Sequence, residues 1–424
     1  MTAADRAEAQ RRVTRVLVAG QLVGAAGLAS ATVVGAFVVQ DILGPSTPWG
    51  GVASATFTLG AALMSVVLAQ VMAVATRRRG LAVGYGAAVV GGLVAGLGAQ
   101  RRSLPVFLAG LVVYGGGQAA NYLARYAATD LAPPERRGAA MSRILFASTF
   151  GAVLGPLLVR PAEWAGEEWF GWRRYTGPWV FAAALFVVAA LNVALRLRPD
   201  PLDVLRATEG AHGRGASDPV DAVDARRATR GALVLVGRVE GARQGVVAMV
   251  ISQATMVAVM TMTPVHLKSH GHEAVSPWVV SLHIAGMFAF SPLAGAAVDR
   301  RGRRWGVLVA AGLLVAANVL ASVAGDGHLL LFPSLWLLGV GWNFGLIAGS
   351  SMLVDAVPAQ ERVRVQGAAD LMMSLCGATA GFASGFIHAA VGFRVLALLA
   401  LVLAAWMGAL AWRTPATRPA AVRA

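Results

Sequence analysis

Methionine and histidine side chains gather in one stretch of this sequence at a spacing that suits metal binding. Four of the seven histidines and four of the thirteen methionines fall between Met256 and Met287. Met256 and Met260 are four residues apart, as are His283 and Met287, so on a helix each pair shares one face. Thioethers and imidazoles are soft ligands that suit Cu(I), whereas Mg, Ca and Mn prefer oxygen. We therefore examine Met256, Met260, His283 and Met287 as a candidate copper site.

Each of these side chains also has a plainer interpretation. Methionine pairs in apolar helices usually serve packing. His283 could hydrogen-bond a neighbouring helix, although an ionisable side chain in a span is a functional candidate by default. Three further histidines, His266, His270 and His272, follow in the segment HLKSHGH. They suit either a path that hands a metal inward or a solvated turn, and we favour the turn.

The elements that must position these residues are membrane-spanning helices. Of the 424 residues, 57% are hydrophobic and 13% are charged, whereas a soluble domain carries roughly 25% charged residues. Apolar runs long enough to cross a hydrocarbon core of roughly 30 Å recur along the whole chain. We expect an all-α polytopic membrane protein with twelve spans, in which segments 243–265 and 275–298 hold the two pairs at similar depth.

The distribution of charge predicts the partners and the orientation. The net charge of +15 lies in short segments between apolar runs rather than on a domain face, so we expect a lipid bilayer and no nucleic acid. Lys and Arg concentrate on the side that carries both chain ends, which predicts cytoplasmic termini and a location in the cell inner (plasma) membrane. With Cys376 as the single cysteine, no intrachain disulfide is expected.

The sequence lacks the patterns of several other functional classes. No GxxxxGK[ST] loop is present, so direct drive by ATP within this chain is not expected. No span pairs a nucleophile with a base, so we expect neither an enzyme nor a prosthetic group.

Internal repeats divide the chain into two similar halves. RRRG, ending at Gly80, resembles DRRG, ending at Gly302, and ERRGAAMS from Glu135 resembles ERVRVQGAAD from Glu361. Such repeats imply a pseudo-two-fold axis along the membrane normal, with a binding site between the halves. We expect six-helix halves at 1–197 and 243–424, joined by a cytoplasmic linker at 198–242. The polar composition of the linker favours a disordered tether.

The segment GAAVDRRGRR resembles the loop signature of the major facilitator superfamily. Its matching residues here are Gly295, Asp299, Arg300, Gly302 and Arg303. The resemblance implies the fold of that superfamily and transport by alternating access between its two halves. Asp299 can accept hydrogen bonds from the N-terminal amides of a neighbouring span, while the arginines pair across the bundle.

The copy of this signature in the first half departs from the pattern. Arg77 stands where the signature has Asp, and Ala73 stands where it has Gly. The departure leaves the fold assignment intact but predicts no equivalent charge lock in that half.

Two shorter segments resemble one branch of that superfamily. MVAVM and HIAGM are similar to the M-x-x-x-M and H-x-x-x-M pairs in spans 7 and 8 of the CcoA-like copper importers. This resemblance implies that the chain imports copper, as a transported substrate, through the four residues of the candidate site. The same broad branch resembles riboflavin importers, so an organic substrate stays open. A drug/proton exporter and a non-transporting membrane sensor are the remaining alternatives.

Polar residues in other spans are candidates for the substrate path. Gln118 and Asn121 fall in the fourth span and Asn343 falls in the tenth. Each could face a polar cleft or could hydrogen-bond a neighbouring helix.

Charged residues in spans are candidates for gating and proton coupling. We expect Arg143 and Asp370 to meet across the pseudo-axis and to close a cytoplasmic gate. Arg125, near a cytoplasmic helix end, is expected to extend its side chain to the membrane surface. Asp41, near the outer end of the first span, is the other carboxylate considered for proton coupling, and the coupling ion stays open.

Overall fold

Helices make up every regular element of the part of the chain that the structure describes. The computed structural model covers residues 3–44, 52–208, 222–272 and 275–413. The first group of helices comprises α1 (Ala3–Leu43), α2 (Val52–Val74), α3 (Arg77–Arg101), α4 (Leu104–Ala127), α5 (Arg137–Phe170) and α6 (Thr176–Arg196). After two shorter helices, α7 (Pro201–Thr208) and α8 (Ala222–Arg238), the second group comprises α9 (Glu240–Ser269), α10 (Ser276–Phe288), α11 (Ser291–Arg301), α12 (Arg303–Val323), α13 (Leu331–Ala356) and α14 (Ala359–Arg413).

Local backbone features divide two stretches of the second group: Gly392 separates the predicted spans 364–389 and 391–412, and the predicted span 275–298 is in two pieces. Helix α14 changes direction at Gly392, whose φ of 81° lies in the left-handed region that glycine adopts without a steric penalty. Helices α10 and α11 follow one another as two separate helices. Pro292 occupies the first turn of α11, where a backbone N–H would have no acceptor within the helix, so the lack of an N–H in proline costs nothing there.

The helices have the length and composition of membrane spans. Among the described residues, nine helices are long and apolar enough to cross a bilayer. That count takes α14 once, although Gly392 divides it, and it leaves out α4 and α5, which are 24 and 34 residues long. The set of helices is therefore compatible with the twelve spans expected from the sequence.

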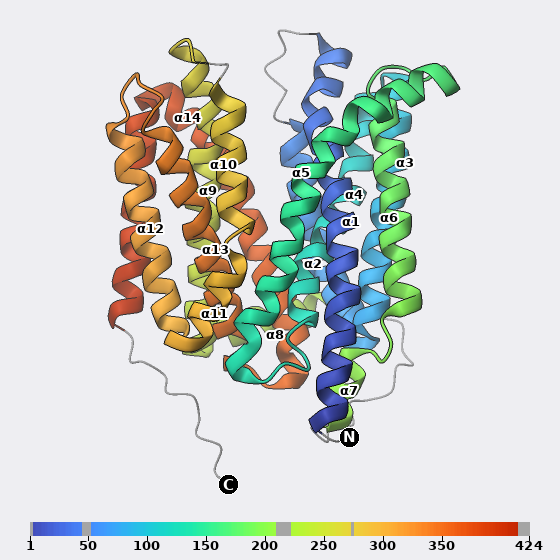
Figure 1. The fold of residues 1–424 in the computed structure, drawn as a ribbon, viewed down its shortest axis with the longest axis vertical. Coiled ribbons are helices and arrows are strands. Elements are labelled where there is room, and N and C mark those ends of the chain that lie inside the picture. The colour runs from blue at the N-terminus through green and yellow to red at the C-terminus, as the bar shows by residue number, and fades with distance from the viewer. Residues whose placement is uncertain (1–2, 45–51, 209–221, 273–274, 414–424) are drawn as a thin grey trace.

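The two groups of helices lie side by side and touch at one end (Figure 1). This end, where α1 begins and α14 ends, is called the termini side below. Helix α5 packs against α10, α11 and α13, while α2 and α4 pack against α14. The outer faces expose apolar side chains such as Leu195, Val402 and Trp406, as expected for helices that contact lipid.

The linker contains more structure than its composition predicts. Asp200 accepts hydrogen bonds from the backbone amides of Arg77 and Arg78 and so caps the start of α3. Leu202 and Leu205 of α7 are buried at 3% and 2% exposure. The prediction of a disordered tether is therefore wrong for the described part of 198–242, while residues 209–221 lie outside the described residues.

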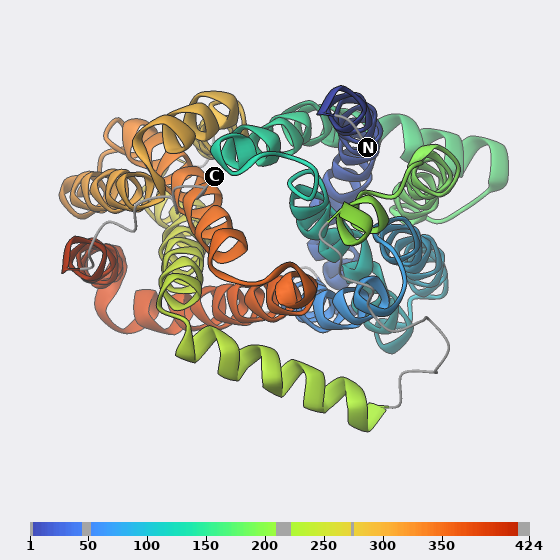
Figure 2. The same cartoon turned by 90° about the horizontal axis from the view of Figure 1, so that it is seen from below.

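Helix α8 lies along one outer edge of the molecule, at the termini side (Figure 2). Figure 2 shows it running along the termini side, next to α14. Its Ala232 and Val236 are buried, and its Thr229 accepts a hydrogen bond from Gln70 of α2. The apolar pair Ala232 and Val236, four residues apart, is the sequence signal that indicates this helix.

Candidate functional site

The first contact between the two groups joins α11 to the beginning of α5. Asp299 accepts hydrogen bonds from the backbone amides of Gly138 (2.9 Å) and Ala139 (2.7 Å). The two backbones approach closely, since a Cβ atom on Gly295 would lie 2.5 Å from the Gly138 carbonyl oxygen. A carboxylate at a helix N-terminus is favoured because the first amides lack acceptors within the helix. This is the arrangement that the loop signature predicts.

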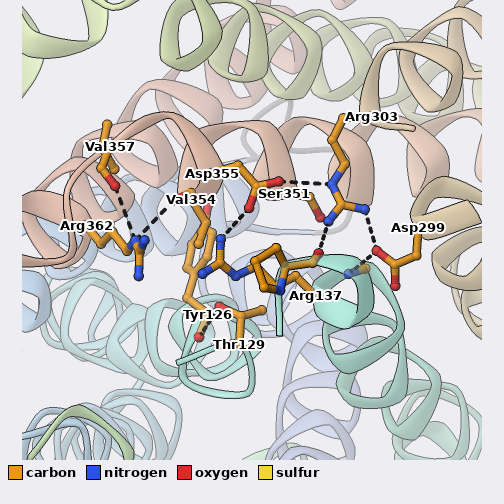
Figure 3. Close-up of polar contacts among 12 residues, drawn as sticks. Tyr126, Thr129, Arg137, Asp299, Arg303, Ser351, Val354, Asp355, Val357 and Arg362 are labelled. Carbon is orange, nitrogen blue, oxygen red and sulfur yellow. Dashed lines mark hydrogen bonds and ion pairs between the residues drawn. The ribbon is translucent and has the colours of Figure 1, made fainter. Parts of the chain in front are cut away.

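Arginines extend this contact into a network that Figure 3 shows in close-up. Arg303 forms ion pairs with Asp299 and, at 3.1 Å, with Asp355 of α13. It also donates to the Pro134 carbonyl, and Arg137 of α5 pairs with the same Asp355. The network therefore contains charged groups from both groups of helices.

The remaining two signature residues have simpler positions. Gly302 separates α11 from α12 with a φ of 96°, a conformation that few side chains tolerate. Arg300 is exposed to solvent.

The second contact inverts the expected charge. Arg77, at the start of α3, is fully buried and pairs through two nitrogens with Asp130, at 2.8 and 3.0 Å. Its Nη2 also donates to Gln366 of α14, at 2.9 Å. A guanidinium thus stands where the signature has a carboxylate, and it still bridges the two groups. The prediction that this half lacks a charge lock is wrong, because Asp130 supplies the missing carboxylate from a loop 53 residues further along the chain.

Asp370 also lies at a contact between the groups, but its partner is not the one expected. Asp370 of α14 pairs with Arg125 of α4 at 2.5 Å, and both side chains are at most 1% exposed. Arg125 also donates to the hydroxyls of Tyr126 (3.1 Å) and Ser350 (3.3 Å). Arg143 is exposed on α5. The predicted Arg143–Asp370 pair is therefore corrected to Arg125–Asp370, because α14 faces α2 and α4 rather than α5. The expectation that Arg125 extends its side chain to the membrane surface is also wrong, because that side chain is 1% exposed and pairs with Asp370.

His283 of the predicted copper site has one nitrogen fixed and one free. Its Nδ1 lies 2.8 Å from the Leu335 carbonyl oxygen on α13. Since a carbonyl can only accept, Nδ1 carries the hydrogen, and in a neutral imidazole Nε2 then offers a lone pair. The side chain is fully buried, and Nε2 has no hydrogen-bond partner among the described residues.

A shared contact with Trp342 of α13 fixes the relative depth of α9 and α10. The indole donates to Gln253 of α9 at 2.7 Å, and its ring lies 5.9 Å from that of Phe288 of α10. Met256 and Met260 follow Gln253 by three and seven residues, while Met287 and His283 precede Phe288 by one and five. At a rise of about 1.5 Å per residue, all four lie within about 11 Å of Gln253 or Phe288 along their helix axes, on the side away from the termini.

The three histidines after the methionine pair contact a neighbouring loop. His266 Nε2 lies 3.0 Å from the Gly325 carbonyl, and His270 Nε2 lies 3.1 Å from Asp326. The His272 ring lies 4.4 Å from that of His328. Within the part of the chain that the structure describes, no group of three His, Cys, Asp or Glu residues is arranged to hold a metal ion. These contacts support a turn packed on the loop between α12 and α13.

The other polar candidates lie apart from one another. Asn121 accepts from the Tyr85 hydroxyl within the first group, and Asn343 donates to the Met287 carbonyl and to Ser291 within the second. Gln118 is half-buried on α4.

Asp41 has a different environment from the one expected. Its side chain is 47% exposed in the last turn of α1 and lies 3.7 Å from Arg102. Of the two carboxylates considered for proton coupling, only Asp370 is thus buried.

The apolar helices and the paired contacts between two groups of helices define a polytopic membrane transporter. The family model of the Major Facilitator Superfamily matches residues 17–277 and 245–424, and the chain belongs to this superfamily.

Relatives and solved structures agree with this assignment. The uncharacterized MFS-type transporter YdeG of Bacillus subtilis (strain 168) is 36% identical over 93% of this chain and 89% of its own length. The riboflavin transporter RfnT of Brucella anthropi is 30% identical over 82% of this chain and 83% of its own length. The human organic anion transporter MFSD10 has a TM-score of 0.78 at 16% identity, covering 95% of this chain and 99% of its own. The proton:xylose symporter XylE has a TM-score of 0.75 at 15% identity, covering 98% of both chains.

Proposed function

We propose that this transporter imports copper as Cu(I), with Met256, Met260, His283 and Met287 as ligands of the transported ion. The observation that carries the proposal is the state of His283, whose Nδ1 is fixed by the Leu335 carbonyl while its buried Nε2 has no partner. Metal-binding histidines characteristically donate their second ring N–H to such an acceptor. The resemblance of MVAVM and HIAGM to the CcoA-like importers supports the same assignment.

Neutral ligands suit a transported ion. Thioethers are uncharged, so a site made of them is less costly to bury in a bilayer than one made of carboxylates. Met256 is 5% exposed, and Met260 and Met287 are half-buried. A monovalent ion held by such groups can also be released, as transport requires.

The contacts that close the termini side are compatible with the proposed import cycle. Asp299, Arg303, Arg77 and Arg125 all join the two groups at or near that side. In such a cycle, the ion reaches the site from the opposite side and leaves after these contacts break. If the termini face the cytoplasm, as the distribution of Lys and Arg predicts, this direction is inward.

The test is uptake by purified protein in liposomes, with radiocopper under reducing conditions and riboflavin compared side by side. Met256→Leu removes the sulfur but keeps the volume, and His283→Asn removes the imidazole. Each should lower copper uptake by at least roughly the 10–100-fold that loss of a supporting partner costs a metal site. Met262→Leu, on the same helix but outside the predicted set, is the matched control. Unchanged copper uptake by Met256→Leu and His283→Asn would rule out this site.

A riboflavin importer is the second candidate, because the relative RfnT is a riboflavin transporter. Trp342 and Gln253 form a buried aromatic and amide pair at the level below the methionines. Riboflavin uptake that survives Met256→Leu but falls with Trp342→Leu would favour this candidate. Copper binding without flux would instead indicate a sensor.

A further inference from the structure

A cavity opens on the termini side of the second group of helices, away from the predicted cargo site. Its volume is about 420 Å³, within the roughly 300–1,000 Å³ typical of small-molecule sites. It lies among the beginnings of α9 and α12 and the ends of α13 and α14. None of the residues proposed to bind copper lines it.

The rim of the cavity is basic. Arg243, Arg304 and Arg413 line it together with a single acidic residue, Glu240, which accepts a hydrogen bond from Gln244. Arg304 donates to the carbonyls of Ala411 and Trp412, which ties it to the end of α14. Arg243 and Arg413 are exposed at the rim. Three positive charges against one negative charge favour an anionic group at this place.

The walls of the cavity are apolar and reach the lipid-facing surface. Val247, Val307 and Met407 line the interior. Trp406 and Leu410 also line it, yet they are 52% and 36% exposed on the outer face of α14. An apolar chain could therefore enter from the side, while a charged head stays at the level of the helix ends.

The corresponding corner of the first group is filled by the protein itself. There α7 packs against α1, and its Leu202 and Leu205 are buried. Asp200, just before α7, accepts a hydrogen bond from a backbone amide at the start of α3. In the second group, the described residues do not fill the corresponding corner, and the cavity lies there.

We propose that the cavity binds an anionic phospholipid, with the phosphate against Arg243 and Arg413 and one acyl chain along Met407, Trp406 and Leu410. A zwitterionic lipid presents no net charge to the basic rim, and a free inorganic anion leaves the apolar walls unused. Juxtamembrane arginines attract anionic lipids through the same electrostatic interaction. The site is independent of the cargo, because its lining shares no residue with the predicted copper ligands.

The test uses the full-length protein in detergent and measures retained lipid by native mass spectrometry. Phosphatidylglycerol and phosphatidylcholine with identical acyl chains are compared, with inorganic phosphate as a third arm. The wild type should retain phosphatidylglycerol roughly tenfold better, and Arg243→Gln/Arg413→Gln should abolish the preference. Arg196→Gln, an exposed arginine at the end of α6 in the first group, should leave it intact.

A second variant keeps the test decisive if the double substitution unfolds. Val247→Trp fills the cavity and leaves the charges in place, so it should reduce retention of both lipids. Equal retention of the two lipids by the wild type would overturn the proposal. So would displacement of phosphatidylglycerol by millimolar phosphate alone, or an unchanged preference in a folded double variant. Copper uptake is measured in parallel, so failure of the lipid site is distinguishable from failure of the cargo assignment.

Discussion

The Arg125–Asp370 pair shows how a charge is accommodated deep in the molecule. Both side chains are at most 1% exposed, and Arg125 lies over the Tyr126 ring at 4.4 Å while it donates to the Tyr126 and Ser350 hydroxyls. Removing two charges from water is expensive. These acceptors satisfy the guanidinium, whereas Oδ2 of Asp370 has no hydrogen-bond partner among the described residues. The pair joins α4 to α14, and it must separate whenever the two groups of helices move apart on the termini side.

Removing one charge of this pair should destabilise the closed protein strongly. Asp370→Asn leaves Arg125 as an uncompensated buried charge, a loss of about 3–5 kcal/mol in the free energy of unfolding. The double variant Arg125→Gln/Asp370→Asn should recover part of that loss. Chemical denaturation in detergent, together with transport in liposomes, measures both effects.

Arg143→Gln is the matched control, because this arginine is exposed on α5. It should change stability by no more than about 0.5 kcal/mol. An effect of Arg143→Gln as large as that of Asp370→Asn would contradict the specific role assigned to the buried pair.

At the residue scale, the sequence predicts those contacts whose two partners follow from one motif. Asp299 is such a case, because the loop signature names the carboxylate and its acceptor role on helix amides. The partner of Arg77 could not be read in this way, since Asp130 lies in an unpatterned loop. Asp370 lies at a contact between the two groups, as expected, but helical periodicity gives the depth of a side chain and not the identity of the facing helix.

The crossing of α5 and α11 depends on two glycines that let the helix backbones approach. A Cβ atom on Gly295 would lie 2.5 Å from both the Gly138 carbonyl oxygen and the Ser142 hydroxyl. Small residues of this kind allow close packing of membrane helices. Helix α11 can therefore pack on α5 closely enough for Asp299 to reach the α5 amides. A larger side chain at Gly295 would prevent this packing.

Gly295→Val should bias the protein toward an open termini side and lower transport by roughly tenfold or more. Spin labels on Arg136 and Arg300, both exposed and next to this crossing, measure the change by double electron–electron resonance. The variant should shift the distance distribution to longer values than the wild type shows. Gly312→Val, on α12 with open space around its Cβ position, should keep the wild-type distribution. An unchanged distribution for Gly295→Val would contradict the role of this crossing.

The linker shows where element-scale prediction failed. Its Arg, Asp, Gly and Ala composition indicated a tether, yet α7 and α8 each bury apolar side chains. Short helices that depend on tertiary contacts carry weak signals, because most helical stability comes from packing rather than from propensity.

At the scale of the whole molecule, the fold followed from composition, apolar runs and one loop signature. Apolar runs specify helices in a bilayer because every backbone polar group must be satisfied within its own segment. The relative placement of the two groups of helices could not be obtained in this way. It depends on side chains such as Arg137 and Asp355, which lie 218 residues apart in sequence.

The orientation in the membrane can be tested directly by cysteine labelling. In a Cys376→Ser background, Arg136→Cys places a thiol on the termini side and Trp169→Cys places one at the far end of α5, where the side chain is 67% exposed. If the termini are cytoplasmic, an impermeant maleimide should label only Trp169→Cys in intact cells and both variants after permeabilisation. Labelling of Arg136→Cys alone in intact cells would reverse the predicted orientation.

The two corners that join the groups of helices differ in what a mutation can do to them. Asp299 bonds to main-chain amides at Gly138 and Ala139, and only proline lacks such an amide hydrogen. Arg77 reaches α14 through the Gln366 side chain, which many single-nucleotide changes would erase. In a saturation mutagenesis library, variants with an altered transport rate should therefore be found mainly among substitutions at Arg77, Asp130 and Gln366. Of the two amide positions on α5, Ala139 should tolerate exchange of small residues without such an effect, whereas a Cβ atom on Gly138 would lie 2.8 Å from Asp299 Oδ1.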